Sequence, residues 1–245
     1  MSVIERLDAG AASDAGDDGE VIGHHGLFSL VHRSLESDLA KLETAVDDLT
    51  LADRVERGRK MDHWFRGYAK VVRHHHRIEH ELFWSALVAE TGPKPALEQL
   101  AEDFAVLDAA LEAVRAGFWR FRHAREFVVP QYELVQQIQQ ARAALRTYVA
   151  HEEAGLVEPF RARFVNGEFP KVDPRITAGL GLRGAAFAVP WALGGLTEDE
   201  RRELLPQVPA PLRLLYRACQ LAYQRKAAAL NLWSPKSLRY EPASA

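Results

Sequence analysis

The sequence contains a single cysteine, no long apolar run and no signal-peptide pattern. Cys219 alone cannot form a disulfide within the chain, which excludes a small disulfide-stabilised domain. The opening residues lack the basic and then apolar pattern of a secreted precursor, so we expect a cytoplasmic protein. No uninterrupted apolar stretch approaches the roughly 20 residues that a membrane span needs. The richest one, 185–196, contains Pro190 and two glycines, so we expect no membrane association.

An excess of charge of one sign is also missing. The 245 residues include 31 Lys and Arg and 34 Asp and Glu, which gives a formal net charge of −3. The two signs are mixed along the chain, without a basic face that could neutralise a phosphate backbone. Nucleic acid is therefore not an expected partner. With 47% hydrophobic residues, the chain can bury the core of one globular domain with an extension.

Composition divides the chain into three parts. Residues 1–22 are acidic and rich in small residues, too polar to offset the entropy of ordering them, so we expect a disordered acidic tail. Residues 23–165 carry helical periodicity. Residues 166–245 begin with an irregular stretch rich in Gly and Pro, and Thr197 with Glu200 then forms a capping box. We expect this last part to be a C-terminal helical extension, a loop and two helices packed on the outside of the domain.

What the chain does have is four long segments with an apolar residue at every third or fourth position. They cover residues 28–49, 53–88, 97–117 and 130–159, and this spacing is typical of amphipathic helices. No alternating strand pattern lies between them. The sequence therefore predicts an all-α fold, an up-down four-helix bundle.

Histidine and glutamate residues occupy core-facing positions of these helices. His75 and Glu79, one turn apart, project from the same side of the second helix. His32 on the first helix and Glu152 or Glu153 at the end of the fourth can face them. Two neutral imidazoles and two carboxylates suit iron, manganese or zinc. A single histidine on an apolar stripe is more often a hydrogen-bonded core residue, but burying all these groups together is costly unless a metal compensates their charges.

Three other histidines of the second helix are weaker candidates for metal ligands. His74, His76 and His80 lie off the inward stripe, so we expect them to be solvated or to contact the ligands from behind. His76 and His80 are also one turn apart and form a second pair that could bind metal adventitiously.

Several motifs together resemble the hemerythrin-like proteins with HHE cation-binding domains, over about residues 26–165. The most specific motif is HHRIEHELFW at 75–84. The weaker ones are VHRSL at 31–35, DFAVLD at 103–108, and HEE at 151–153 with Pro159. In that family the ligands are a first-helix His, a second-helix His-x-x-x-Glu, third-helix histidines, and a fourth-helix His followed five residues later by a carboxylate. The resemblance therefore implies a hemerythrin-like bundle with the metal ligands His32, His75, Glu79 and Glu153.

Two positions depart from the family pattern. Phe104 occupies the third-helix histidine position, with Asp108 four residues later, and Tyr148 occupies the fourth-helix histidine position. In the two-iron arrangement of the family, these positions serve one metal and the first two helices serve the other. Three arrangements remain open: one metal at the surviving half, two metals with Asp108 and the Tyr148 phenolate as ligands, or no metal with Phe104 filling core volume. We expect the first, and Glu152 remains a candidate ligand beside Glu153.

The resemblance implies a non-haem metal protein, with iron as the expected metal and manganese or zinc as alternatives. It would bind or activate a small oxidant such as dioxygen, peroxide or nitric oxide, with or without a small organic substrate. A partial site leaves open metal positions, which favours an oxidoreductase or a sensor over a reversible oxygen carrier. Tyr148 is the candidate catalytic residue, as ligand, proton donor or redox-active phenol. The alternative is a metal-free structural or interaction protein that retains the bundle.

Overall fold

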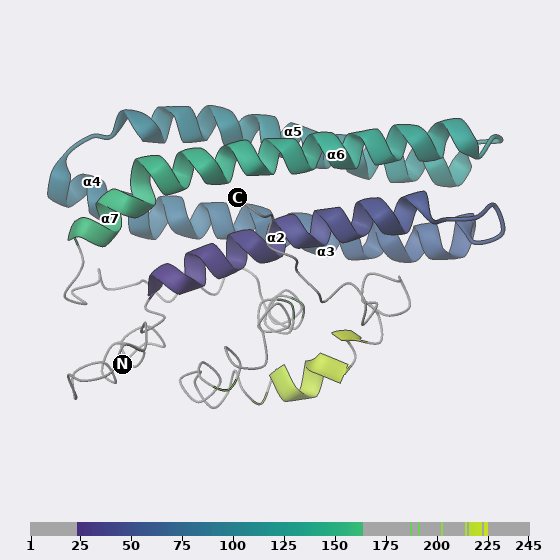
Figure 1. Cartoon of the computed structure of the whole chain (residues 1–245), viewed down its shortest axis with the longest axis horizontal. Coiled ribbons are helices and arrows are strands. Elements are labelled where there is room, and N and C mark those ends of the chain that lie inside the picture. The colour runs from purple at the N-terminus through teal and green to yellow at the C-terminus, as the bar shows by residue number, and fades with distance from the viewer. Residues whose placement is uncertain are drawn as a thin grey trace, which may run out of the picture.

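The computed structural model describes residues 24–163 and, further along, 187, 191, 202, 214, 216–221, 223 and 224. Their regular secondary structure is helical, without a strand, so the expected all-α fold is confirmed for this part of the chain. Four long helices lie side by side (Figure 1): α2, His24–Asp47; α3, Arg54–Ile78; α5, Pro95–His123; and α6, Val128–Glu152. The predicted tail 1–22 and most of the predicted extension 166–245 lie outside the described residues. No helix in the described part is long and apolar enough to cross a membrane.

Hydrogen bonds from two side chains fix the end of the molecule where the turns 48–53 and 124–127 meet. Gln131, in the first turn of α6, donates its amide to carbonyl oxygens at the end of α2, at 2.8 to 3.1 Å. They are the carbonyls of Val46 and Asp47, in the last turn of α2, and of Leu49 just after it, where a helix end leaves oxygens available. Arg54 of α3 donates to the carbonyl of Glu126 at 2.8 Å. At this end of the molecule, these hydrogen bonds join α6 to α2, and α3 to the turn between α5 and α6.

Apolar side chains from all four long helices fill the interior. α5 packs along α3 and α6, and α6 also packs along α2. Each fully buried aliphatic or phenyl side chain contributes about 1.5–3 kcal/mol relative to an exposed one. Buried members of this core include Leu39 and Leu42 of α2, Met61 and Phe65 of α3, Leu107 and Phe118 of α5, and Ile138 and Leu145 of α6.

Gly117 lies inside a helix and does not end one, which corrects the sequence prediction. α5 continues through Gly117 to His123. A Cβ atom at position 117 would lie 3.0 Å from Leu134 Cδ1 and would collide with the side chain of Gln137, both on α6. The glycine therefore permits the close approach of α5 and α6. Pro159 also lies within a helix, because it is the second residue of α7 (Glu158–Arg163).

Two π-helical segments interrupt the α-helical geometry. η1, Glu79–Trp84, connects α3 to α4 (Ser85–Thr91), and η2, Glu153–Val157, connects α6 to α7. The periodicity predicts a single α-helix over 53–88, and η1 corrects this prediction. Such π segments are often found at functional sites. Here each begins at a glutamate that was singled out as a candidate ligand.

Aromatic residues from the C-terminal part pack on α2 and α3. Trp191 is buried and donates its Nε1 to Asp38 Oδ2 at 2.5 Å. Phe187 covers Gly67, where a Cβ atom would lie 3.0 Å from the ring. The glycine therefore leaves room for Phe187, whose ring also contacts that of Tyr223.

Candidate metal centre

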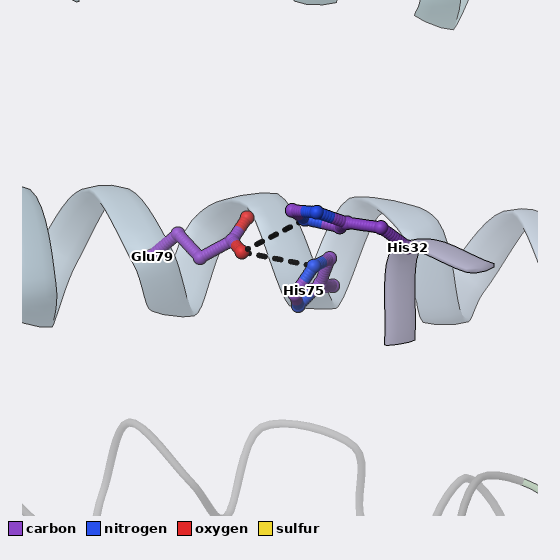
Figure 2. A group of neighbouring side chains, drawn as sticks. All are labelled: His32, His75 and Glu79. Atoms are coloured by element: carbon purple, nitrogen blue, oxygen red, sulfur yellow. Dashed lines mark ion pairs between the residues drawn. The ribbon is translucent and has the colours of Figure 1, made fainter. Parts of the chain in front are cut away.

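Two histidines and a glutamate meet between α2 and α3. One ligand atom from each of His32, His75 and Glu79 lies within 4.8 Å of the others. Glu79 Oε1 is 2.9 Å from His75 Nε2 and 3.5 Å from His32 Nε2. Figure 2 shows this oxygen facing both imidazoles. The structure thus brings together three of the predicted ligands.

The local helix geometry explains this meeting. His75 belongs to the last turn of α3 and Glu79 follows four residues later, so both side chains lie on one face. His32 comes from the facing helix α2. Glu79 is fully buried and His32 is 4% exposed, whereas the side chain of His75 is 16% exposed. Of these three residues, His75 is therefore the nearest to solvent.

Glu152 is a fourth buried side chain that could bind a metal at this place. Its Oε2 is 3.2 Å from His32 Nε2. Its Oε1 accepts hydrogen bonds from Trp84 Nε1 at 3.0 Å and from the Tyr148 hydroxyl at 3.2 Å. Because Oε1 is held by these two donors, Oε2 is the oxygen left for the cluster.

Glu153 lies on the other side of His32. Its side chain is 46% exposed, and its Oε1 is 3.3 Å from His32 Nδ1. The resemblance implies Glu153 as a ligand, but the carboxylate near His32 Nε2, on the same side as Glu79, belongs to Glu152. Glu153 is placed to orient the His32 ring through its second nitrogen, as carboxylates behind metal-bound histidines do.

Several buried nitrogen and oxygen atoms of this group make no hydrogen bond within the described part of the chain, and each of them could bind a metal. They are Nε2 of His32 and of His75, both oxygens of Glu79, and Oε2 of Glu152. Some of these atoms are close enough for an ion pair, but their angles do not suit a hydrogen bond. Buried polar atoms normally have partners, and each one left without costs about 1–3 kcal/mol. A cation bound between these atoms would give each of them a partner.

The charges of the cluster shift one another's ionisation. Burial lowers the pKa of His32, but Glu152, Glu153 and Glu79 outweigh it and raise this pKa to about 11. Burial raises the pKa of Glu79, but His75 and His32 outweigh it and lower this pKa to about 2. Burial and the charge of Glu79 raise the pKa of Glu152. Without a metal, a protonated His32 is therefore the cation that the carboxylates surround.

The positions that depart from the family pattern form an aromatic group beside the cluster. The rings of His76 and Phe104 are stacked, with centroids 3.5 Å apart and planes at 9°. His76 Nδ1 lies 2.9 Å from the Tyr148 hydroxyl. Burial, followed by the charges of Glu79 and Glu152, raises the pKa of Tyr148 well above its ordinary value. The hydroxyl therefore stays protonated and can donate to Glu152.

Other candidate residues are not brought to the cluster. Asp108 Oδ1 accepts a hydrogen bond from Arg73 Nε at 2.5 Å. The imidazole of His74 contacts Arg77, and His80 is exposed. Asp108 therefore serves as an ion-pair partner between α3 and α5, where the sequence allowed a ligand.

Sequence reasoning missed the roles of Trp84 and His76. Trp84 lies within the recognised motif, but only the structure reveals its hydrogen bond to Glu152. His76 is off the inward stripe, as predicted. Its ring nevertheless stacks on that of Phe104, and its Nδ1 lies within hydrogen-bond distance of the Tyr148 hydroxyl. The sequence offered one signal for these contacts: Tyr148 and Glu152 are one helical turn apart, so their side chains can meet.

The chain was compared with protein-family models, with curated proteins and with solved structures, and none of the three comparisons found a match. The motifs of the sequence and the side-chain geometry are therefore the basis for a functional assignment.

Proposed function

We propose that His32, His75, Glu79 and Glu152 hold one metal ion in an up-down four-helix bundle of the hemerythrin-like type. The observation that carries this proposal is the meeting of His32, His75 and Glu79, with Glu152 Oε2 3.2 Å from His32 Nε2, through buried atoms that make no hydrogen bond. Iron is the metal we propose, because two imidazoles and two carboxylates suit it, although manganese and zinc accept the same donors.

The energetics of burial support a metal. Glu79 and Glu152 are both fully buried, and two adjacent carboxylates in a core repel each other. A divalent cation would compensate both charges and bind the nitrogen and oxygen atoms that make no hydrogen bond. The π segments that begin at Glu79 and Glu153 support the same site, because such segments are frequent at functional sites.

One ion fits the contacts better than two. A second ion would need donors at positions 104 and 148, but Phe104 is stacked on His76. The Tyr148 hydroxyl is already used by Glu152 and His76. Asp108 is paired with Arg73. These contacts occupy the half of the site that would hold the second ion.

We further propose that the protein binds or activates a small oxidant, as an oxidoreductase or a sensor. Bound iron supplies open coordination positions for dioxygen, peroxide or nitric oxide and the electrons that activate them. Trp84 and Tyr148 orient Glu152 through its Oε1. The stacked rings of Phe104 and His76 lie beside Tyr148. Tyr148 holds its proton on the hydroxyl oxygen, within reach of the centre.

A metal-free scaffold is the second candidate, and one observation favours it. The pKa of His32, raised to about 11 by the three carboxylates around it, means that a proton can occupy the place of the metal. Metal binding must then displace this proton. The test is the metal content of the full chain, purified without a histidine tag.

The reaction with oxidants tests the function itself. Protein loaded with ferrous iron without oxygen is mixed with dioxygen, peroxide or nitric oxide, and its absorption is followed. We expect a saturable spectral change with at least one of them, and no such change in the His75→Ala variant. His80→Ala is the matched control, because His80 is an exposed histidine five residues after His75, in η1. A loaded protein that responds to none of the three oxidants contradicts the proposed function.

The ligand assignment has its own test. Glu152→Gln should abolish tight iron binding, because it removes the charge that faces the cluster. Glu153→Gln should lower the affinity by at most about 10- to 100-fold, the typical effect of a residue that orients a ligand. The reverse ranking of the two variants would mean that Glu153 is the ligand.

A further inference from the structure

An open pocket lies between α3 and α5, away from the metal centre. Its volume is about 390 Å³, and Arg66, Arg115, Ala116, Trp119 and Arg120 line it. No carboxylate belongs to this lining. Arg66 precedes His75 by nine residues, so it lies about 13 Å away along the helix axis. The pocket is therefore separate from the cluster of histidines and glutamates.

Basic charge exceeds acidic charge around this pocket. Asp62 is shared by Arg66 and Arg122, and Glu112 is shared by Arg73 and Arg115. Arg73 has a second partner in Asp108, whereas the partner of Arg120 is the neutral side-chain amide of Gln137. Five guanidinium groups thus face three carboxylates. Two positive charges are left over, on a chain whose net charge is −3.

The arginines of the pocket are positioned and still have donors to spare. A guanidinium group has five N–H donors in a fixed fork. Arg66 uses two donor nitrogens for Asp62, and Arg115 uses one for Glu112. With the Gln137 amide turned so that both its ends have partners, the Arg120 guanidinium donates one hydrogen bond to it. Arginines with unused donors commonly bind phosphate through two parallel hydrogen bonds.

Trp119 adds a flat apolar surface beside these charges. It is 59% exposed. Its ring is stacked on that of His123 with centroids 4.7 Å apart, and its carbonyl accepts a hydrogen bond from His123 Nδ1 at 2.7 Å. The indole is thus held in place while much of it contacts water. Aromatic side chains of this kind stack with the rings of nucleobases and related ligands.

We propose that this pocket binds a phosphate monoester carried on a flat ring, a ligand of about the size of a mononucleotide. The dianionic phosphate offsets the excess of two positive charges around the pocket, and the ring lies against Trp119. The volume falls in the range of about 300–1,000 Å³ that small-molecule sites occupy. This inference does not depend on the metal centre.

Calorimetric titration of the full chain tests the proposal, after a chelator has removed metal that could itself bind phosphate. Adenosine monophosphate and phenyl phosphate are the probes, and inorganic phosphate and adenosine represent the two halves of the ligand. We expect both probes to saturate one site per chain. Inorganic phosphate and adenosine should each bind at least about tenfold more weakly, a difference of about 1.4 kcal/mol. Binding should also weaken as salt is raised.

Variants locate the site. Arg115→Gln with Arg120→Gln, and separately Trp119→Leu, should each weaken the binding of adenosine monophosphate at least about tenfold. Arg59→Gln and Tyr132→Ala are the matched controls, an exposed arginine on α3 and an exposed aromatic residue on α6, neither of which lines the pocket. Circular dichroism checks that each variant is folded. Both controls should bind as the parent does.

Three results would overturn the proposal. The first is the absence of saturable binding of either probe at millimolar concentration. The second is equal affinity for inorganic phosphate and for adenosine monophosphate, since the ring would then contribute nothing. The third is binding that survives both the double arginine variant and Trp119→Leu. The His75→Ala variant should still bind the probes, so failure here is distinct from failure of the metal site.

Discussion

Replacing Tyr148 by phenylalanine removes one oxygen atom that two neighbours use. The Tyr148 hydroxyl donates to Glu152 Oε1 at 3.2 Å and lies 2.9 Å from His76 Nδ1. The ring itself is buried and would keep its packing, because phenylalanine has nearly the same shape. The substitution thus isolates the contribution of the hydroxyl to the site.

The expected loss follows from the charge that Glu152 carries at a pH above its raised pKa. A hydrogen bond to an ionised group contributes about 1.5–3 kcal/mol, against about 0.5–1.5 kcal/mol for a typical neutral pair. Metal-free Tyr148→Phe should therefore lose about 1.5–3 kcal/mol of unfolding free energy. Trp84 still donates to the same oxygen, which prevents a larger loss. The matched control is Tyr68→Phe, because the buried Tyr68 hydroxyl donates to a neutral carbonyl, that of Leu35.

Urea denaturation of the two variants measures these losses, and metal analysis of the loaded proteins measures the ion count. We expect Tyr148→Phe to keep about one iron per chain, because four other side chains hold the ion. A tyrosinate bound to ferric iron would absorb visible light, and we expect no such band in the parent protein. A coloured parent that bleaches in the variant and loses one of two irons would refute the one-metal arrangement.

The remaining predictions concern the packing of the helices and of the C-terminal residues. Trp191→Phe should cost about 1–3 kcal/mol in urea denaturation, because Asp38 loses a buried hydrogen-bond donor. Burial raises the pKa of Asp38, with Lys41 and Trp191 opposing it. The stability linked to Asp38 is therefore complete below the ordinary pKa of 3.8 and is lost as pH rises through the raised value. Asp38→Asn should flatten the pH dependence of unfolding in that window, and an unchanged profile would contradict the shift. Gly117→Ala should lower the denaturation midpoint, because overpacking against Leu134 and Gln137 costs about 1–3 kcal/mol, more than the roughly 1 kcal/mol that alanine gains over glycine inside a helix; a raised midpoint would refute that close contact.

The helices could be predicted because each needs an apolar stripe to pack against the others. The stripes in 28–49, 53–88 and 97–117 indicated where the helices lie, and the structure has helices there. The predicted end of the third helix at Gly117 was wrong, because glycine in a sequence can signal either a helix end or a close contact between helices. Only the position of Gln137 on the neighbouring helix decides between the two. The π segments were equally hidden, because a one-residue shift does not disturb a short apolar pattern.

The candidate site was predictable to the extent that it depends on helical pitch. The spacing of His75 and Glu79 placed them together, and the inward position of His32 was readable from its stripe. The choice between Glu152 and Glu153 was not readable, because it depends on where α6 changes into η2. Asp108 was four residues from a family position, but its pairing with Arg73 depends on the rotation of α5 against α3.

Counting iron in the full chain, reconstituted without oxygen and freed of loosely bound metal, tests the central claim most directly. The measurement uses elemental analysis of the parent protein, of His75→Ala and of the control His80→Ala. The proposed site predicts about one iron per chain in the parent and in the control, and close to none in His75→Ala. A parent without iron would support the metal-free scaffold, and iron retained equally in His75→Ala would show that the metal is bound elsewhere.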